Sequence, residues 1–222
     1  MKKFSFVLVF ALFVCIFLPA CNKKSIYEDA LSEVRYDILF GESDNLKCYA
    51  NVGFKEFPLE NDNKKATVKN CVTFRIIPKD GNMDKVYSVE FLVDKENYGD
   101  TFSEDEITHA LTVTIITAVK VATPLTVTVR TTDYADDIIL SSTLPQDTID
   151  YKQALKSGAT ILYDLFQENI SGGVLLGEIR MRVIVDENKS YWYMGYHYGN
   201  DKTIALLLDG ATGELLAQRE KN

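Results

Sequence analysis

The alternation of apolar and polar positions predicts β-strands through most of residues 46–144. Between residues 72 and 76, Val, Phe and Ile alternate with Thr and Arg, which is the pattern of a strand with one buried face. The Pro-Lys-Asp-Gly-Asn sequence at 78–82 is typical of a turn, so we expect the strands on its two sides to pair as a hairpin. A second hairpin is expected around the polar turn at 131–137. The strands predicted in this part are 46–54, 67–77, 86–93, 125–130 and 138–144.

Two segments have helical spacing instead. In residues 26–38, apolar residues recur every three or four positions with charged residues between them, which predicts a short amphipathic helix that ends near Gly41. Ser103 and Glu106 fit a capping box, and the apolar positions of 107–122 match one face of a helix. This second segment is also rich in Thr, Val and Ile, which favour strands. Its cap and its length favour a helix, which we predict.

The last third of the chain has the clearest element signals. Asp150, with Gln153 three positions later, fits a capping box before a helix over 151–166, and two Gly residues at 172–173 interrupt the chain. Four strands follow, and their short connections imply antiparallel neighbours. These strands are 174–185, 190–198, 203–208 and 214–218.

Together these elements predict the α+β class, with two small domains of antiparallel sheet plus helix. The polar, turn-forming sequence from Pro145 to Thr148 is where we place the boundary between them. The first α+β domain would span 30–146. The second would span 147–222 and consist of a helix followed by a four-strand antiparallel meander.

The N-terminal residues have the pattern of a bacterial export signal. Two Lys residues follow the initial Met, and the apolar stretch at 4–18 is shorter than the about 20 residues that span a membrane. The Leu-Pro-Ala-Cys sequence at 18–21 resembles the lipobox of bacterial lipoproteins. The resemblance implies that residues 1–20 are removed, that Cys21 carries the lipid, and that 21–29 tether the protein to the extracytoplasmic face of the cell membrane. Simple secretion and a retained anchor are the alternatives.

The chain is acidic, with 24 basic residues, 32 acidic residues and a formal net charge of −8. Removal of residues 1–20 takes away two Lys and no acid, which leaves 22 basic against 32 acidic residues and a charge of −10. This balance argues against a nucleic-acid partner, because phosphate contacts need clustered Lys and Arg. It also argues against electrostatic adhesion to anionic lipid, so the membrane would be a partner through the lipid anchor.

Two cysteines, Cys48 and Cys71, remain in the mature chain besides the lipid site. In an oxidising compartment they could form a disulfide that adds about 3 kcal/mol to stability. The sequence does not place their Cα atoms, so the bonded and the free form both stay open.

The closing hairpin resembles part of a known domain. An apolar strand, Asp209, the Thr-Gly-Glu sequence at 212–214 and a second apolar strand end a segment whose helix contains Ala154 and Leu155. This order of helix, strands and terminal hairpin resembles the PepSY domain, a small extracytoplasmic module. The resemblance implies a non-catalytic role, in which the domain binds or regulates another envelope protein.

One predicted strand has aromatic residues on both faces. Trp192, Tyr196 and Tyr198 would share one face, with further tyrosines on the other. Since Tyr and Trp anchor many interfaces, this face is a candidate stacking or peptide-binding surface. In the alternative, one face packs on the 151–166 helix and the other on the first domain.

Candidates for catalysis or metal binding are few. His109 and His197 have no second His or Cys at metal-ligand spacing, and the chain has no nucleophile-elbow, phosphate-loop or dinucleotide motif. Asp133, Asp136 and Asp137 share a hairpin tip and could hold Ca²⁺ through oxygen ligands. They lack the spacing and the distal Glu of an EF-hand loop, so we interpret them as a solvated turn. We therefore expect no catalytic residue, no metal and no cofactor.

These observations predict a non-enzymatic, membrane-anchored lipoprotein that binds or regulates another envelope protein. Two alternatives stay open: an envelope hydrolase or carbohydrate-handling enzyme, and a solute-binding lipoprotein. An enclosed polar pocket would favour either alternative, whereas an open aromatic sheet would favour the binding module.

Overall fold

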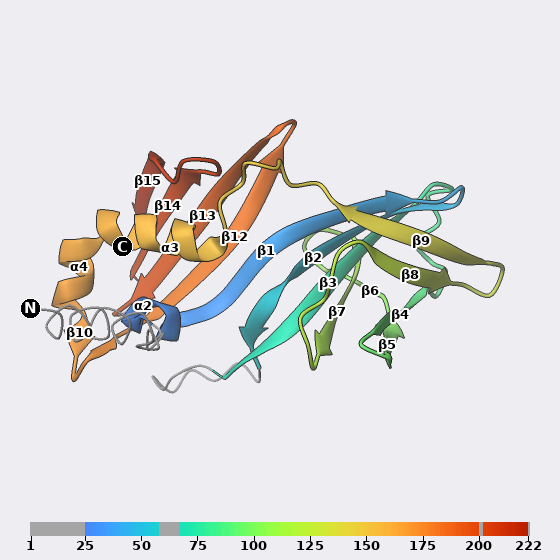
Figure 1. Ribbon diagram of the computed structural model, residues 1–222. Coiled ribbons are helices and arrows are strands. Elements are labelled where there is room, and N and C mark those ends of the chain that lie inside the picture. The colour runs from blue at the N-terminus through green and yellow to red at the C-terminus, as the bar shows by residue number, and fades with distance from the viewer. Residues whose placement is uncertain (1–24, 58–66, 200–201, 222) are drawn as a thin grey trace, which may run out of the picture.

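One long strand takes part in both halves of the molecule (Figure 1). The computed structural model describes residues 25–57, 67–199 and 202–221. Within this part, strand β1 (Leu31–Glu42) is central to a connected, mostly antiparallel 13-stranded sheet. The predicted class of two small α+β domains is therefore wrong, because helices form little of the described chain and the sheet is continuous.

The first half of the chain forms two layers of strands. Its elements are α2 (Ile26–Asp29), β2 (Leu46–Glu56), β3 (Val68–Pro78), β4 (Ser88–Val93), β5 (Glu96–Thr101), β6 (Ser103–Glu104), β7 (Leu111–Thr117), β8 (Leu125–Arg130) and β9 (Ala135–Ser142). One layer runs from β1 through β2 and β3 to β7, and the other from β9 through β8 and β4 to β5. β9 pairs with β1 and β5 contacts β7, so the sheet nearly closes on itself.

Burial alternates along these strands with the period of two that the sequence shows. In β3, Val72, Phe74 and Ile76 are fully buried, whereas Thr73 and Arg75 point away from the core. Each large apolar side chain that is buried contributes about 1.5–3 kcal/mol relative to an exposed position. The packing of the two layers against each other therefore stabilises this half.

Two predicted helices are not formed. In the predicted helix of 26–38, only the single turn of α2 is helical, and β1 begins at Leu31. The predicted helix of 107–122 contains β7, whose side chains Leu111, Val113 and Ile115 are buried alternately.

One of the two predicted hairpins is also wrong. β3 pairs with β2 and β7, whereas β4 pairs with β5 and β8, so the strands flanking the turn at 78–82 lie in different layers. The hairpin predicted around 131–137 is confirmed, since β8 and β9 pair antiparallel.

The second half packs two helices on one face of four strands (Figure 1). Its elements are α3 (Tyr151–Ile161), α4 (Tyr163–Glu168), β10 (Ile170–Ser171), β11 (Val174–Leu175), β12 (Glu178–Asp186), β13 (Lys189–Tyr198), β14 (Lys202–Asp209) and β15 (Leu215–Lys221). The predicted capping box is present: Gln153 N donates to Asp150 Oδ1 (2.8 Å), and Asp150 N donates to Gln153 Oε1 (3.1 Å). β12 to β15 pair antiparallel in chain order.

A bulge in β1 lies where this strand passes from one half to the other. β1 pairs parallel with β12 over its first residues and antiparallel with β2 along most of its length. The register against β2 changes from Arg35 opposite Gly53 to Asp37 opposite Val52, so Tyr36 is the extra residue. An extra residue bends a strand and shifts the side-chain alternation by one position.

Because of the bulge, Val34 and Leu39 lie on the same side of the sheet although they are five residues apart. Val34 belongs to the core beneath α3 and Leu39 to the core between the two strand layers, and both are fully buried. In a regular strand, residues five positions apart would point to opposite faces. One side of the sheet is therefore covered throughout, by helices in one half and by strands in the other.

Buried hydroxyl and thiol groups should make the fold sensitive to alkali. Burial raises the pKa of Tyr36, Tyr87 and Cys48 to about 12, from 10.0 for Tyr and 9.0 for Cys. In the unfolded chain these groups lose their protons at the lower values, so rising pH favours unfolding between pH 9 and about 12. Below pH 9 these groups keep their protons in both the folded and the unfolded state, so their burial does not reduce stability there. We expect the urea midpoint, followed by circular dichroism, to fall steadily across it.

A pair of variants tests the source of this fall. Tyr87→Phe should make the pH slope shallower, because one titrating group that is fully buried is removed. Tyr163→Phe is the matched control, because the Tyr163 side chain is exposed and lies outside both cores. A urea midpoint that stays constant from pH 9 to 12 would contradict the prediction.

Candidate functional site

The side chains of β12 alternate between the covered and the open side of the sheet. Ile179, Met181 and Val183 are buried in the core beneath α3, whereas Arg180 and Arg182 point the other way. Arg182 is exposed and Arg180 is partly exposed. The open side therefore carries the charge of this strand.

The pairing of β1 with β12 adds a third arginine. Arg35 lies directly opposite Arg182 in the parallel register. Like charges that face each other across strands destabilise a sheet, so folding alone does not account for this pair. Two neighbouring arginine–carboxylate pairs are present: Arg35 Nε lies 2.6 Å from Glu33 Oε1, and Arg180 Nη2 lies 2.9 Å from Glu178 Oε2.

Arg182 differs from these two arginines. Among the residues that the structure describes, no carboxylate lies within ion-pair distance of its guanidinium group. The group instead lies 4.7 Å from the centre of the Tyr193 ring on β13. This contact orients a planar guanidinium while leaving its N–H groups free to bind a carboxylate through two hydrogen bonds.

A row across four strands joins two of the arginines. The register runs from Arg180 on β12 through Gly195 and Ala205 to Arg219 on β15. Since neighbouring strands lie about 4.8 Å apart, the Cα atoms of the two arginines are about 14 Å apart. The residues between them have almost no side chain, and the Tyr193 ring lies over Gly195, with its hydroxyl oxygen 3.0 Å from where a Cβ atom would stand. We call the surface formed by Arg35, Arg180, Arg182, Tyr193, His197 and Arg219 the basic face.

The basic face is an exception in an acidic chain. It holds four of the six arginines of a protein whose net charge is −8. A cavity of ≈ 210 Å³ lies within it, and its lining includes Arg35, Arg182 and His197. Guanidinium groups in this arrangement suit carboxylate or phosphate groups, which they bind through paired hydrogen bonds.

His197 belongs to the basic face without adding charge to it. Its Nδ1 atom lies 2.9 Å from the Thr203 hydroxyl on β14. Burial, together with the positive charge of Arg180, lowers the pKa of the imidazole below its ordinary 6.5. The ring is therefore neutral at pH 7, and the positive charge of the face comes from arginine.

Of the two interpretations that the sequence leaves open for Trp192, Tyr196 and Tyr198, the structure favours packing on the helix over a binding face. Trp192 and Tyr196 are 1% and 0% exposed within the core under α3 and α4. Trp192 Nε1 donates to the Ile149 carbonyl (3.0 Å), and the Tyr196 hydroxyl donates to the Leu176 carbonyl. Tyr198 is partly exposed and stacks on Tyr196 at 4.9 Å. The helices cover this face, so the accessible face is the opposite one.

The disulfide that the sequence leaves open is not formed, since Cys48 and Cys71 are free thiols. In the pairing of β2 with β3, Cys48 lies opposite Ile76 and Cys71 lies opposite Gly53. The two positions differ by five residues along the strands, which is about 17 Å. The odd spacing also points the side chains to opposite faces, so they are far beyond disulfide reach.

The predicted signal peptide of 1–20 and the predicted lipid site at Cys21 lie outside the described residues. Of the tether predicted over 21–29, the structure describes Ser25 and the residues that follow.

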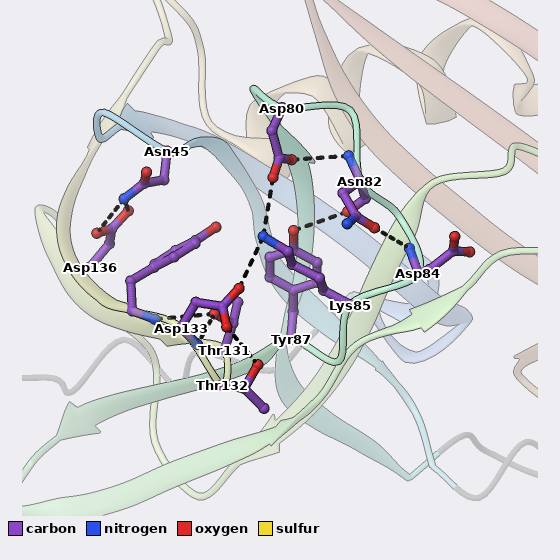
Figure 2. Close-up of polar contacts among 11 residues, drawn as sticks. Asn45, Asp80, Asn82, Asp84, Lys85, Tyr87, Thr131, Thr132, Asp133 and Asp136 are labelled. Atoms are coloured by element: carbon purple, nitrogen blue, oxygen red, sulfur yellow. Dashed lines mark hydrogen bonds and ion pairs between the residues drawn. The ribbon is translucent and has the colours of Figure 1, made fainter.

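The acids of the 131–137 tip make separate contacts (Figure 2). Asp133 and Asp80 each lie 3.2 Å from Lys85 Nζ, so this lysine joins two loops. The Asn45 amide instead donates to both carboxylate oxygens of Asp136 at 3.1 Å. The structure therefore favours the interpretation of these acids as a solvated turn with specific partners.

The remaining candidates for metal binding are also separate. Asp137 accepts a hydrogen bond from the Thr128 hydroxyl (2.6 Å). His109 lies in a turn with a φ of 50°, and its Nδ1 atom lies 2.8 Å from Glu104 Oε1. In the described parts of the chain, no group of three His, Cys, Asp or Glu residues is placed to hold a metal ion.

Comparisons with known proteins do not place the chain in a family. No family model, curated protein or solved structure matches the chain. Among the helices that the structure describes, none has the length and hydropathy needed to cross a membrane. The lipobox and PepSY resemblances therefore stay predictions.

The basic face was missed in the sequence, although part of it was readable there. The alternation within 178–186 places Arg180 and Arg182 on the same side of a strand. Arg35 could not be added to them, because its segment has helical spacing and its strand pairs with β12, which is distant in the sequence.

Proposed function

We propose that this chain is an extracytoplasmic lipoprotein, held on the cell membrane through Cys21, whose basic face binds an acidic segment of another envelope protein without catalysing a reaction. The observation that carries the proposal is the direct opposition of Arg35 and Arg182 on the open side of the sheet. An arginine pair of this kind becomes favourable when a carboxylate lies between the two groups.

The spacing of the arginines suits an extended peptide. Arg180 and Arg219 stand about 14 Å apart, which is the length of about four residues of an extended chain. Carboxylates separated by that length would reach both arginines, and the Tyr193 ring, which lies over Gly195 between them, offers an aromatic contact. The expected ligand is therefore a short segment with spaced Asp or Glu residues.

The charge distribution favours a peptide over a nucleic acid. Glu33 and Glu178 alternate with the arginines of the basic face, and the whole chain has a net charge of −8. The phosphate backbone of a nucleic acid would be repelled by these carboxylates and by the other acidic residues of the chain. A short acidic segment contacts the arginines alone.

One observation favours the solute-binding alternative. A cavity of ≈ 740 Å³ is lined by residues of α3, β3, β5 and β7, among them Lys69, Tyr98, Tyr151 and Lys152. Cavities of about 300–1,000 Å³ commonly hold small ligands. Binding there would not depend on the arginines of the basic face, so a test on those arginines separates the two functions.

Photo-cross-linking in the native membrane tests the proposal. A benzoylphenylalanine at Leu207, which lies opposite Tyr193 on β14, should cross-link one envelope protein through an acidic segment. The double variant Arg35→Gln/Arg182→Gln should weaken this complex about 100-fold or more, because each charge-assisted hydrogen bond contributes about 1.5–3 kcal/mol. High salt should weaken it in the same direction.

The matched control is Arg130→Gln, which removes an arginine from β8, where it lies 3.3 Å from Glu90. This variant should cross-link like the wild type. Equal cross-linking by the double variant would contradict the proposal, and so would a product that contains only sugar polymer or lipid.

A further inference from the structure

A second surface lies beside the first described residue of the tether. Between α2 and α3 there is a cavity of ≈ 820 Å³. We call it the α2–α3 groove. Its lining includes Ser25, Tyr27, Leu155, Lys156, Ala159 and Tyr163.

The start of α2 is held firmly on the body of the protein. Ser25 caps the helix, since its hydroxyl oxygen accepts a hydrogen bond from Glu28 N (3.2 Å). The Tyr27 ring stacks on Phe166 of α4 at 5.1 Å, and Phe166 is fully buried. The position of Ser25 is therefore fixed relative to the α2–α3 groove.

The length of chain between Cys21 and Ser25 limits how far the groove can be from the lipid. Four Cα-to-Cα steps span at most about 15 Å, whatever their conformation. The headgroup layer on each side of a bilayer is itself about 5–8 Å thick. If Cys21 is lipidated, as the proposed function requires, Ser25 lies within about 15 Å of the lipid attached to Cys21.

We infer that the α2–α3 groove lies against the bilayer surface and binds phospholipid headgroups together with the first part of their acyl chains. The exposed side chains suit that contact. Tyr163 lines the groove and is 55% exposed, and tyrosine rings are common at the level of lipid headgroups. Lys152 and Lys156 line the groove together with Glu28 and Asp150. Lys152 Nζ lies 4.0 Å from Glu28 Oε2, so Lys156 is the lysine left to reach a lipid phosphate.

The anchor, rather than net charge, brings this surface to the membrane. The chain carries a net charge of −8, so its attraction to anionic lipid is weak overall. Once tethered, the α2–α3 groove meets lipid at a high effective concentration. The basic face lies on the opposite side of β12 and β13 from α3, so this orientation turns it away from the bilayer and toward a partner.

Fluorescence quenching by spin-labelled lipid tests the orientation. The full chain would be processed in cells and placed in vesicles of phosphatidylethanolamine and phosphatidylglycerol that contain a headgroup-labelled lipid. A dye would be attached at Thr160→Cys beside the groove, or at Ala217→Cys on β15 as the matched control. Cys48 and Cys71 are buried, so labelling is confined to the introduced thiol. We expect several-fold stronger quenching at position 160 than at position 217.

The outcomes separate this inference from the proposed function. Mass spectrometry of the N-terminal peptide shows whether Cys21 is lipidated; an unmodified peptide would overturn the anchor and this inference together. A lipidated protein with equal quenching at both positions would overturn the inference alone. Lys156→Gln with Tyr163→Ser should reduce quenching at position 160 without releasing the protein from vesicles. Unchanged quenching in that variant would show that the groove makes no contact with lipid.

Discussion

Replacing Gly53 with Ala is expected to lower the free energy of unfolding by about 3 kcal/mol. A Cβ atom on Gly53 would overlap the Val34 carbonyl oxygen and lie 3.0 Å from Arg35 Cα. These are backbone atoms at the bulge that lets β1 enter both cores, so no side-chain rotation relieves the overlap. Overpacking of this kind typically costs about 1–3 kcal/mol. We expect a cost at the upper end of this range, because the atoms that would have to move belong to the backbone. Urea unfolding followed by circular dichroism measures the change.

Gly195→Ala is the matched control for this substitution. The nearest atom to a Cβ at Gly195 is the Tyr193 hydroxyl oxygen at 3.0 Å, which is the end of a side chain that can move. We expect a loss of less than about 1 kcal/mol there. If the two substitutions had equal effects, the close approach of β1 and β2 at Gly53 would not limit stability.

Trp192→Ala is expected to cost about 3–5 kcal/mol, which is the usual range for removal of a buried large aromatic side chain. Trp192 is 1% exposed in the core beneath α3, and its indole N–H donates to the Ile149 carbonyl (3.0 Å). The substitution leaves a cavity under the helix and an unpaired carbonyl group just before its cap. Thermal or urea unfolding measures the loss.

The neighbouring Tyr191→Ala serves as the comparison, because Tyr191 lies on the open side of the same strand and is partly exposed. It should lose less than half as much stability as Trp192→Ala. A loss below about 1 kcal/mol for Trp192→Ala would show that the helices do not pack on β13 as described.

Local chemistry made several elements predictable. Asp150 and Gln153 form their capping box through atoms three residues apart, so the start of α3 needs no tertiary information. The alternation in β3 and the short turn between β8 and β9 are local in the same sense. These signals depend on neighbours along the chain, which the sequence displays directly.

The two helix errors have a common cause, because each segment has apolar residues at spacings that a helix and an irregular strand share. In β1, Leu31, Val34 and Ile38 have helical spacing, although they belong to a strand that is bulged at Tyr36 and contributes to two cores. In the second segment, the residues that resemble a helix cap form a turn. Asp105 Oδ1 accepts from Thr108 N (2.7 Å) in a turn, and β-branched residues continue as β7.

By itself, the sequence determined the strands of β2, β3 and β8, the cap of α3, the acidic charge and the alternation that exposes Arg180 and Arg182. Only the tertiary structure decided that β1 joins both halves, that helices cover Trp192, and that Arg35 lies opposite Arg182. The reason is the range of the interactions. Caps and side-chain alternation arise within a few residues, whereas strand partners and covered faces depend on which distant segments can bury their apolar sides together.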